Sequence, residues 1–426
     1  MDKLSRKVSS LKGEIVIPPD KSISHRAALF SLLTEGTVCI NNFSLGQDCL
    51  TSLDLIQKLG AIVEKTGERS FKITAPKILK APSTPLYCGN SGTTTRLISG
   101  ILAGQEFSST LTGDESLSKR PMKRIITPLE QMGAKIKHSD FKLPLTFEPT
   151  KLDGIYYKSP LASAQVKSCV LLAGLFADGE TSFEEPYISR DHTELMLKYL
   201  GADIIRNKTR VYIKKSKLVC RPITVAGDIS SAAFFISAAL ITPNSDITIK
   251  NVGINPTRTG IIDVLKEMGG DIDILNKQIV SGEEVGDIRV KYSELKAATI
   301  EGSVIPRLID EIPILALVAT QAKGTTIIKD AGDLKNKETD RISAAAQVLK
   351  EIGADITPTD DGFIINGKTE LKGGVKTNSF KDHRIAMTEY IAGLITKESV
   401  EIKDFEWVNI SFPEFEELIS VLKVDQ

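Results

Sequence analysis

The chain has 426 residues, more than one hydrophobic core usually supports, so we expect two domains. Its 54 Lys and Arg balance its 54 Asp and Glu, and only 6% of its residues are aromatic, which argues against nucleic-acid or acidic-membrane binding through overall charge. The five cysteines are widely spaced without a CxxC pair, and neither an apolar signal core nor a run of about 18 apolar residues occurs. We therefore expect a soluble cytoplasmic protein without a metal site, in which any electropositive site is local.

The first predicted helix begins in an unusual way. A predicted strand over residues 13–17 stops at two prolines, and Asp20 or Ser22 can then cap a helix that carries Lys21 and Arg26 near its first turn. The helix dipole disfavours cations at an N-terminus unless an anion binds there. This stretch predicts a phosphate or carboxylate pocket, with solvated surface charge as the open alternative.

The chain then shows an internal repeat. A predicted helix ending in Leu-Gly-Ala or a close variant and running into a strand recurs, with its glycine at residues 60, 133, 201, 269 and 353. Short β-rich segments follow apolar helices at residues 36–41, 108–112, 179–184, 246–251, 324–330 and 399–404. Polar residues open the apolar helices near Asp20, Gly89, Ser163, Gly227, Asp310 and Asp382.

These series predict six modules of strand, helix, strand, helix and two strands. The fold class is α/β, with three βαβαββ modules in each of two similar lobes and a cleft between them. We expect residues 16–222 in one lobe and residues 1–15 plus 223–426 in the other, with two crossover strands near residues 11–16 and 221–226 as the hinge. The last module lacks its closing hairpin, and residues 1–10 can supply the missing strand. One continuous α/β solenoid is the alternative.

Cations concentrate at the predicted helix starts. Gly89 to Arg96 forms a glycine-rich turn entering a helix, but it lacks the GK[ST] ending of an ATP-binding loop. Ser163, Gln165 and Lys167 share one helical turn, for which a plain N-cap is the alternative. Lys337 and Arg341 lie four residues apart, predicted on one helical face beside Glu338, with a surface ion-pair network as the alternative.

Carboxylates precede one apolar helix. Asp310 and Glu311 stand just before a helix over residues 314–319, where Asp310 can act as an N-cap or transfer a proton beside a bound anion. Asp382, His383 and Arg384 open another helix. Without a G-x-S-x-G elbow or a metal cluster in the sequence, the pattern favours chemistry on small, multiply anionic substrates by carboxylates, Lys and Arg.

Seven motifs together resemble one family over essentially the whole chain. They are PDKSISHRA, GNSGTTTR, KRP, SAQVK, DEIP, KETDR and DHRIAM, and they are similar to the 5-enolpyruvylshikimate-3-phosphate synthases. SAQVK, RDHTE at residues 190–194 and NPTR at residues 255–258 are similar to the signature of the bacterial class II subgroup. The resemblance implies transfer of the enolpyruvyl group of phosphoenolpyruvate to the 5-hydroxyl of shikimate 3-phosphate, in the shikimate pathway to chorismate and aromatic amino acids. It implies a cytoplasmic monomer without cofactor or metal.

The resemblance also implies site residues. Those for shikimate 3-phosphate are Lys21, Ser22, Arg26, Ser163, Gln165, Ser189, Asp310 and Lys337. Those for phosphoenolpyruvate are Lys21, Gly92, Arg120, Gln165, Arg341 and Arg384. The implied catalytic residues are Lys21, Asp310, which takes the hydroxyl proton, and Glu338, which protonates the methylene carbon.

Two other readings stay open. A UDP-N-acetylglucosamine enolpyruvyl transferase shares the repeat but carries a loop cysteine, which the segment from Leu117 to Pro121 lacks. A non-catalytic protein that binds polyanions or RNA 3′ ends shares only the electropositive cleft.

One residue departs from the family pattern. Ile410 stands where many class I members have a lysine.

Overall fold

The computed structural model describes residues 2–424, which divide into two compact units. Within these residues, unit 1 comprises 2–18, 227–278 and 284–424, and unit 2 comprises 19–226 and 279–283. The chain thus leaves unit 1 after Pro18 and returns to it after Ala226. Each unit has its own hydrophobic core, and no buried residue of one core belongs to the other.

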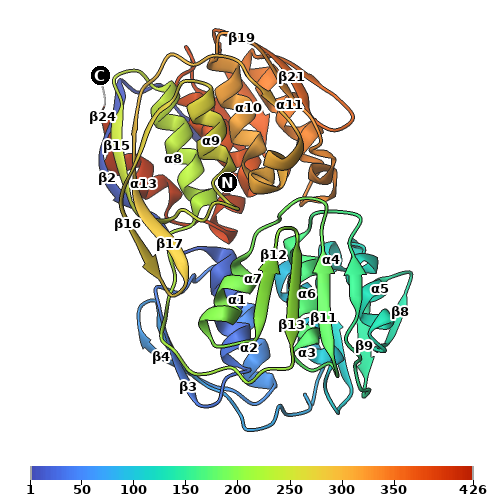
Figure 1. Cartoon of the computed structure of the whole chain (residues 1–426). Helices are drawn as coiled ribbons and strands as arrows, with labels where there is room; N and C mark the ends of the chain where they lie inside the picture. The colour runs from blue at the N-terminus through green and yellow to red at the C-terminus, as the bar shows by residue number, and fades with distance from the viewer. Residues whose placement is uncertain (1, 425–426) are drawn as a thin grey trace. The chain divides into compact units, whose positions relative to one another are not determined.

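Unit 2 consists of three four-stranded sheets and the helices packed on them, drawn from blue to green in Figure 1. Its helices are α1 (Lys21–Ser31), α2 (Gln47–Lys58), α3 (Gly92–Ala103), α4 (Glu115–Lys119), α5 (Lys123–Gln131), α6 (Ala164–Gly174) and α7 (His192–Tyr199). Its strands are β3 (Thr37–Asn41), β4 (Ile62–Gly67), β5 (Ser70–Thr74), β6 (Leu86–Tyr87), β7 (Ser109–Thr112), β8 (Lys135–Ser139), β9 (Lys142–Glu148), β10 (Tyr156–Lys158), β11 (Glu180–Glu184), β12 (Ile204–Asn207), β13 (Arg210–Lys214) and β14 (Ile223–Thr224). The sheet orders are β14-β3-β5-β4, β6-β7-β9-β8 and β10-β11-β13-β12.

Unit 1 repeats this plan with sheets of orders β16-β17-β15-β2-β24, β18-β19-β21-β20 and β1-β23-β22. Its helices are α8 (Ile229–Ile241), α9 (Gly260–Glu267), α10 (Ile312–Gln321), α11 (Arg341–Ile352), α12 (His383–Gly393) and α13 (Phe415–Leu422), with short 3-10 turns η1 (Gly302–Arg307), η2 (Ile309–Glu311), η3 (Gly332–Asn336) and η4 (Phe405–Ile410). Its strands are β1 (Lys3–Ser5), β2 (Ser10–Val16), β15 (Asp246–Gly253), β16 (Asp271–Val280), β17 (Glu283–Lys291), β18 (Thr299–Ile300), β19 (Gly324–Ile328), β20 (Asp355–Pro358), β21 (Phe363–Gly367), β22 (Val375–Asn378), β23 (Val400–Lys403) and β24 (Lys423–Val424).

The predicted repeat is confirmed in the structure. Strands β3, β7, β11, β15, β19 and β23 fall within or beside the six β-rich segments of the sequence. The glycine that follows each Leu-Gly-Ala helix has a positive φ, between 88° at Gly201 and 113° at Gly353. These left-handed residues end the helix and turn the chain into the following strand, which explains why glycine recurs there.

The two units exchange their opening strands relative to the order of the sequence. The strand that the sequence placed at the head of the first module, β2, pairs in parallel with β15 of unit 1, with Ile15 opposite Ile249. The strand before α8, β14, pairs in parallel with β3 of unit 2 instead. The missing strand of the last module is β1, antiparallel to β23, so the expectation that residues 1–10 supply it is confirmed.

The central helices are buried on nearly every side. In α8 and α10 every residue is buried except Ser231 and Gln321, as their apolar and small-residue composition requires. In unit 2, α3 packs so closely on α6 that a Cβ on Gly100 would lie 2.1 Å from the Cys169 carbonyl oxygen. Only glycine permits this approach, and it sets the first turns of the two helices side by side.

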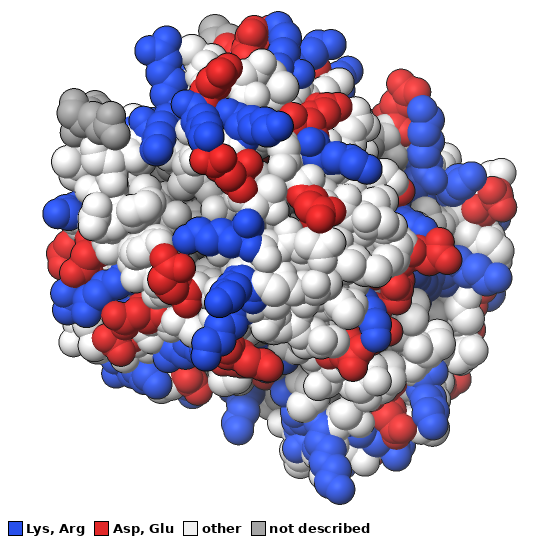
Figure 2. All heavy atoms as spheres, turned by 90° about the horizontal axis from the view of Figure 1, so that it is seen from above, with Lys and Arg blue, Asp and Glu red and all other residues white. Residues whose placement is uncertain are grey.

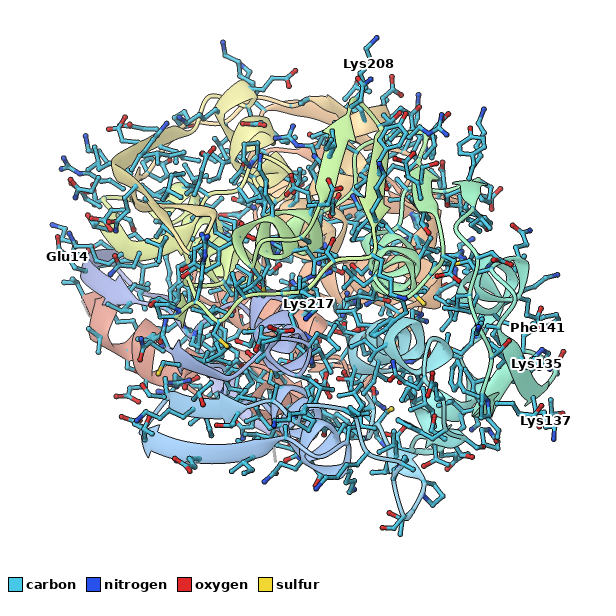
Figure 3. All side chains as sticks on the ribbon, turned by 60° about the horizontal axis from the view of Figure 1, so that its bottom comes forward. Glu14, Lys135, Lys137, Phe141, Lys208 and Lys217 are labelled. Atoms are coloured by element: carbon cyan, nitrogen blue, oxygen red, sulfur yellow. The ribbon has the colours of Figure 1, made fainter. Side chains whose placement is uncertain are left out.

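Polar side chains cover the outer faces. On the hairpin of β8 and β9, Lys135 and Lys137 extend away from the sheet in Figure 3. Figure 2 shows Lys and Arg interspersed with Asp and Glu on the face turned to the viewer, as the balanced composition predicts. Between residues 2 and 424, no helix is long and apolar enough to cross a membrane.

Candidate active site

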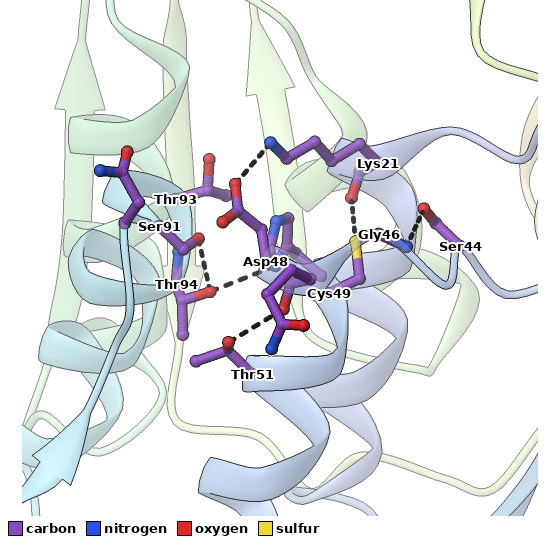
Figure 4. A network of polar contacts seen from close by, with 12 residues as sticks. Lys21, Ser44, Gly46, Asp48, Cys49, Thr51, Ser91, Thr93 and Thr94 are labelled. Atoms are coloured by element: carbon purple, nitrogen blue, oxygen red, sulfur yellow. Dashed lines mark hydrogen bonds and ion pairs between the residues drawn. The ribbon is translucent and has the colours of Figure 1, made fainter. Parts of the chain in front are cut away.

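The first turn of α1 is built as the sequence predicts. The Asp20 carboxylate accepts a hydrogen bond from the Ile23 backbone N–H at 2.8 Å and so caps the helix. The Lys21 ammonium, on the first helical residue, pairs with the Asp48 carboxylate on α2 at 2.5 Å (Figure 4). Sequence reasoning missed Asp48, because only the packing of α1 on α2 brings it beside Lys21.

A chain of neutral groups joins α1, α2 and α3 behind Lys21. His25 Nδ1 lies 2.8 Å from Ser52 Oγ, Ser52 lies 2.9 Å from Thr94 Oγ1, and Ser91 Oγ lies 2.7 Å from Thr94 Oγ1. Burial lowers the pKa of His25 to about 3, so the ring is neutral at neutral pH. His25 therefore links the helix starts as a neutral ring.

Arg26 is buried and held by uncharged groups. Its Nε donates to Thr193 Oγ1 on α7 at 2.8 Å, one terminal nitrogen donates to Ser168 Oγ on α6 at 2.9 Å, and the other donates to the Ser22 carbonyl oxygen at 2.9 Å. Burial lowers its pKa to about 10, which leaves it a cation at neutral pH. These three hydrogen bonds fix the guanidinium in place, and none of them goes to a carboxylate. Sequence reasoning missed Ser168 and Thr193, although both lie beside or within the SAQVK and RDHTE motifs.

The glycine-rich turn and the start of α6 meet through Gln165. Its amide oxygen accepts from Arg96 at 2.6 Å, and its amide nitrogen donates to Thr93 Oγ1 at 3.0 Å. A Cβ on Gly92 would lie 2.7 Å from the same Arg96 nitrogen and 3.6 Å from Arg120. The predicted residues Gly92, Arg120 and Gln165 therefore surround one spot, together with Arg96.

Arg120, Ser163 and Ser189 complete the set of predicted residues in unit 2. Arg120 donates to Asn90 Oδ1 at 2.8 Å, and Asn90 donates to the Asp114 carboxylate at 2.7 Å, so the turn also fixes Arg120. Ser163 is the N-cap residue of α6, but its hydroxyl makes no capping bond. Ser163 therefore holds the N-cap position of the alternative interpretation, but its side chain does not cap the helix. Ser189 is almost fully buried, and its hydroxyl donates to Glu185 at 2.6 Å.

In unit 1, Asp310 meets two cations. Its carboxylate lies 3.0 Å from the Lys337 ammonium and 3.5 Å from the Arg341 guanidinium. Asp310 lies in η2, and the N-cap residue of α10 is Glu311, so the expectation that Asp310 caps this helix is wrong. The helix begins at Ile312, two residues earlier than the sequence suggested, and Asp310 and Glu311 belong to the 3-10 turn that precedes it.

Arg341 lies at the centre of three carboxylates. It contacts Glu338 at 2.6 Å and Asp382 at 2.8 Å as well as Asp310. Burial by itself lowers the pKa of Arg341. The three carboxylates raise this pKa by a larger amount, so its net shift is upward. The pKa of Asp382 is raised by burial but lowered overall by Arg341.

The predicted helical face shared by Lys337 and Arg341 is wrong. Lys337 follows η3 in extended conformation, and α11 begins only at Arg341, capped by the Asp340 side chain. A surface ion-pair network is also excluded, because Arg341 is 1% exposed. The two cations converge on Asp310 from a loop and a helix start.

Arg384 completes this group at the start of α12. It donates to the Asp310 carbonyl oxygen at 3.1 Å and lies 3.8 Å from the fully buried Glu311 carboxylate. Glu311 accepts a very short hydrogen bond from Ser230 on α8, which in turn accepts from Arg258 at 2.8 Å. Sequence reasoning left Arg258 without a partner, because its loop lies far along the chain from Ser230.

Each unit thus assembles its own set of predicted residues. Unit 2 offers Lys21, Ser22, Arg26, Gly92, Arg120, Ser163 and Gln165 near the starts of α1, α3 and α6. Unit 1 offers two carboxylates, Asp310 and Glu338, beside Lys337, Arg341 and Arg384. The first set suits an anion, and the second suits proton transfer beside an anion. Among residues 2–424, no group of three or more His, Cys, Asp or Glu could hold a metal ion.

Comparison with known proteins points to one family. The family described as EPSP synthase (3-phosphoshikimate 1-carboxyvinyltransferase) matches residues 5–419. Proteins named 3-phosphoshikimate 1-carboxyvinyltransferase are 51% identical in Bacillus licheniformis, covering 98% of both chains, and 51% identical in Thermoanaerobacter sp., covering 99% of this chain and 100% of the relative. The protein of that name in Bacillus subtilis is 50% identical, again over 98% of both chains.

Solved structures agree with the sequence comparison. The structure of EPSP synthase from Acinetobacter baumannii superposes with a TM-score of 0.90 at 42% identity, covering 100% of this chain and 98% of the other. The enolpyruvyl transferase NikO from Streptomyces tendae superposes with a TM-score of 0.80 at 16% identity, covering 98% and 96% of the two chains. At that identity NikO supports the shared α/β fold alone.

Proposed function

Because the chain belongs to the EPSP synthase (3-phosphoshikimate 1-carboxyvinyltransferase) family, we propose that it transfers the enolpyruvyl group of phosphoenolpyruvate to the 5-hydroxyl of shikimate 3-phosphate. The products are 5-enolpyruvylshikimate 3-phosphate and phosphate. The observation that carries the proposal is the cluster of Asp310 and Glu338 around Arg341, because the reaction needs two proton-transfer groups beside a bound anion.

The residues of unit 2 bind the two anions. Ser22, Arg26, Ser163 and Ser189 contact shikimate 3-phosphate, while Gly92 and Arg120 contact phosphoenolpyruvate. Lys21 and Gln165 serve both substrates. Donors at helix starts are suited to phosphate and carboxylate groups, since the backbone N–H groups and helix dipoles point the same way.

The residues of unit 1 perform the proton transfers. Glu338 protonates the methylene carbon of phosphoenolpyruvate while Asp310 accepts the proton of the attacking hydroxyl, which gives a tetrahedral intermediate. Loss of one methyl proton and of phosphate then restores the double bond. Lys337, Arg341 and Arg384 lie beside these carboxylates and hold the substrate's charged groups.

The two residue sets act together only if one ligand engages both. We therefore propose that shikimate 3-phosphate draws the two units together. Small-angle X-ray scattering should show a smaller radius of gyration on adding shikimate 3-phosphate, with shikimate at the same concentration as the control. An unchanged radius at saturation would contradict this closure but not the catalytic proposal.

Phosphate release tests the proposed activity. Purified protein with shikimate 3-phosphate and phosphoenolpyruvate should release phosphate, and mass spectrometry should detect the enolpyruvyl product. UDP-N-acetylglucosamine in place of shikimate 3-phosphate tests the alternative transferase. Phosphate release with UDP-N-acetylglucosamine but not with shikimate 3-phosphate would overturn the proposal.

We also propose that the protein is a cytoplasmic monomer that needs no cofactor. Size-exclusion chromatography with light scattering checks the monomer, and assays after exhaustive chelation check the absence of a metal requirement.

A further inference from the structure

The NPTR motif has no part in the function proposed above, although its arginine is buried. Arg258 is 2% exposed and lies in the loop between β15 and α9. The loop folds around Asn255, whose side-chain oxygen accepts from the Thr257 backbone N–H at 2.8 Å and whose carbonyl oxygen accepts from the Arg258 backbone N–H at 2.8 Å. A buried guanidinium is costly unless it is well paired, so the placement of Arg258 calls for an explanation.

The Arg258 guanidinium contacts the start of α8. One terminal nitrogen donates to Ser230 Oγ at 2.8 Å and to the Asp228 carboxylate at 3.2 Å. Asp228 is the N-cap residue of this helix, and its carboxylate also accepts from the Ser230 backbone N–H at 2.8 Å. Asp228 is therefore a charge partner of Arg258, and the bond to Ser230 is additional to that pair.

The direction of the next hydrogen bond follows from Arg258. A guanidinium only donates, so Ser230 Oγ accepts from it and keeps its own proton for another partner. That partner is Oε1 of Glu311, the last residue of η2, whose side chain is fully buried. The donors thus point in one direction, from Arg258 through Ser230 to Glu311, and bonds in such a chain strengthen one another.

Glu311 in turn lies beside Arg384. Its Oε1 is 3.8 Å from a terminal nitrogen of Arg384, and the same nitrogen donates to the Asp310 carbonyl oxygen at 3.1 Å. Within residues 2–424 the Arg384 guanidinium has no further hydrogen bond or ion pair, so its other two nitrogens remain for a ligand. Arg341, by contrast, already contacts three carboxylates. The orientation of Arg384 therefore depends on Glu311 and one carbonyl group.

We infer that Glu311 and Arg258 are positioning residues that hold the Arg384 guanidinium in the orientation that phosphoenolpyruvate binding needs. The inference rests on the proposed function, in which Arg384 contacts phosphoenolpyruvate. An arginine side chain that is ordered before the substrate arrives loses less rotamer freedom on binding, and this raises affinity. Glu311 supplies that order, and Ser230 fixes Glu311 to Arg258.

An effect of the Glu311 charge alone would have the opposite sign. A negative charge 3.8 Å from Arg384 weakens the attraction of this guanidinium for an anion. If only the charge mattered, neutralising Glu311 would strengthen phosphoenolpyruvate binding. If orientation matters more, neutralising Glu311 weakens binding, so the sign of the change separates the two effects.

Glu311→Gln tests the positioning role. The amide oxygen can still accept from Ser230, but the side chain no longer attracts Arg384. We expect the KM for phosphoenolpyruvate to rise about three- to tenfold, while kcat and the affinity for shikimate 3-phosphate stay within about twofold. Steady-state kinetics give KM and kcat, and calorimetry gives the affinity. An unchanged or lower KM for phosphoenolpyruvate overturns the inference.

Ser230→Ala tests the link to Arg258 with every charge left in place. It removes one oxygen atom, so it keeps the inference testable if Glu311→Gln fails to fold. We expect the KM for phosphoenolpyruvate to rise about two- to fivefold, and Glu311→Gln to add less in this background than in the unmodified chain. An unchanged KM in Ser230→Ala overturns the inference.

Arg307 supplies a matched control for Arg258. Its Nε donates to the Pro256 carbonyl oxygen at 2.7 Å and it pairs with Asp263 at 2.5 Å, so it holds the same loop without contacting Ser230 or Glu311. Arg258→Met should raise the KM for phosphoenolpyruvate at least threefold, whereas Arg307→Met should leave it within about twofold. Equal rises would show that disturbance of the loop is the cause and would overturn the role of Arg258.

A double-mutant cycle tests whether Glu311 acts through Arg384. In an Arg384→Ala chain, adding Glu311→Gln should change the KM for phosphoenolpyruvate less than about twofold. The same fold-change in both backgrounds would mean that Glu311 acts elsewhere, and it overturns the inference. Failure of the unmodified chain to release phosphate from phosphoenolpyruvate and shikimate 3-phosphate would instead overturn the proposed function.

Discussion

The two units repeat one architecture but hold their cations in different ways. In unit 2, Arg26 is held by Ser168, Thr193 and a carbonyl oxygen, and Arg120 is held by Asn90. In unit 1, Arg341 is surrounded by three carboxylates. Arg26 and Arg120 therefore have neutral partners in unit 2, whereas Arg341 has carboxylate partners in unit 1. Unit 2 also holds ion pairs, Lys21 with Asp48 and Lys167 with Glu185.

This difference separates two tasks. A guanidinium held by hydroxyl and amide groups keeps its charge for an incoming anion, which suits substrate binding. A guanidinium that bridges carboxylates holds those carboxylates close together, which suits proton transfer. Equivalent substitutions in the two units should therefore have different consequences.

The largest expected effect is on stability and compares Arg341 with Arg26. Arg341→Met leaves Asp310, Glu338 and the buried Asp382 without their shared cation, and we expect a loss of about 3–5 kcal/mol. Arg26→Met leaves only hydroxyl and carbonyl partners, and we expect about 1–3 kcal/mol. Urea unfolding followed by circular dichroism measures both.

An exposed arginine is the control for this comparison. Arg289→Met breaks a surface pair with Asp246 at 2.7 Å, which should cost less than about 1 kcal/mol. Equal losses for Arg341→Met and Arg26→Met would mean that the ionic network of unit 1 is no more integral to its stability than the neutral network of unit 2.

The next effect concerns the carboxylates of unit 1. Asp310→Asn and Glu338→Gln keep the side-chain shape but remove proton transfer, so turnover should fall about a hundredfold or more with little change in substrate binding. Steady-state kinetics together with calorimetry separate the two quantities. Glu370→Gln, which only loses an exposed pair with Lys397, is the control. Lost binding with near-normal residual turnover would show that both residues are structural.

Stability should depend on pH in opposite directions in the two units. Burial raises the pKa of Glu389, on α12 of unit 1, to about 8, with Thr377 opposing and Glu351 adding to the shift. Because the folded pKa lies above the ordinary 4.5, the folded chain binds the proton more tightly. Stability from Glu389 is present below pH 4.5 and falls by up to about 1.4 kcal/mol per pH unit as the pH rises toward 8.

His25 in unit 2 has the reverse dependence. Its folded pKa of about 3 lies below the ordinary 6.5, so its contribution is present above pH 6.5 and is lost as the pH falls toward 3. Unfolding free energies of Glu389→Gln and His25→Gln across this range check both slopes. Glu389→Gln should remove only the loss of stability between about pH 4.5 and 8, and unchanged slopes would refute the assignment.

The smallest expected effect is at Gly92. A methyl group there would lie 2.7 Å from an Arg96 nitrogen and must displace this guanidinium from Gln165. We expect the KM for phosphoenolpyruvate to rise by up to about tenfold, or 1.4 kcal/mol, with a smaller change for shikimate 3-phosphate. Gly332→Ala, whose Cβ meets nothing closer than 3.8 Å, is the control.

A double substitution shows whether Arg96 carries the effect of Gly92→Ala. If it does, adding Gly92→Ala to an Arg96→Ala chain should change the KM for phosphoenolpyruvate little further. Fully additive effects would place the cause of the change in direct contact between the methyl group and the substrate.

Local features of the fold could be predicted from the sequence. The glycines after the repeated helices have to adopt positive φ, so their spacing along the chain is enough to reveal the modules. The caps at Asp20 and Asp382 follow from side chains that accept bonds from nearby backbone N–H groups. Lys337 and Arg341 were placed on one helix wrongly, because four-residue spacing does not reveal where a helix begins.

The sequence by itself determined the repeat, the helix starts and the types of residue placed on them, because these depend on backbone conformation and hydrogen bonds over a few residues. Only the tertiary structure decided which groups meet: Asp48 beside Lys21, Thr193 and Ser168 around Arg26, and Glu185 behind Ser189. It also decided that β2 pairs with β15 and that β14 pairs with β3, so each of these strands joins the unit other than the one whose helix it precedes. Such contacts join residues far apart in the chain, and they depend on how buried helices and sheets pack.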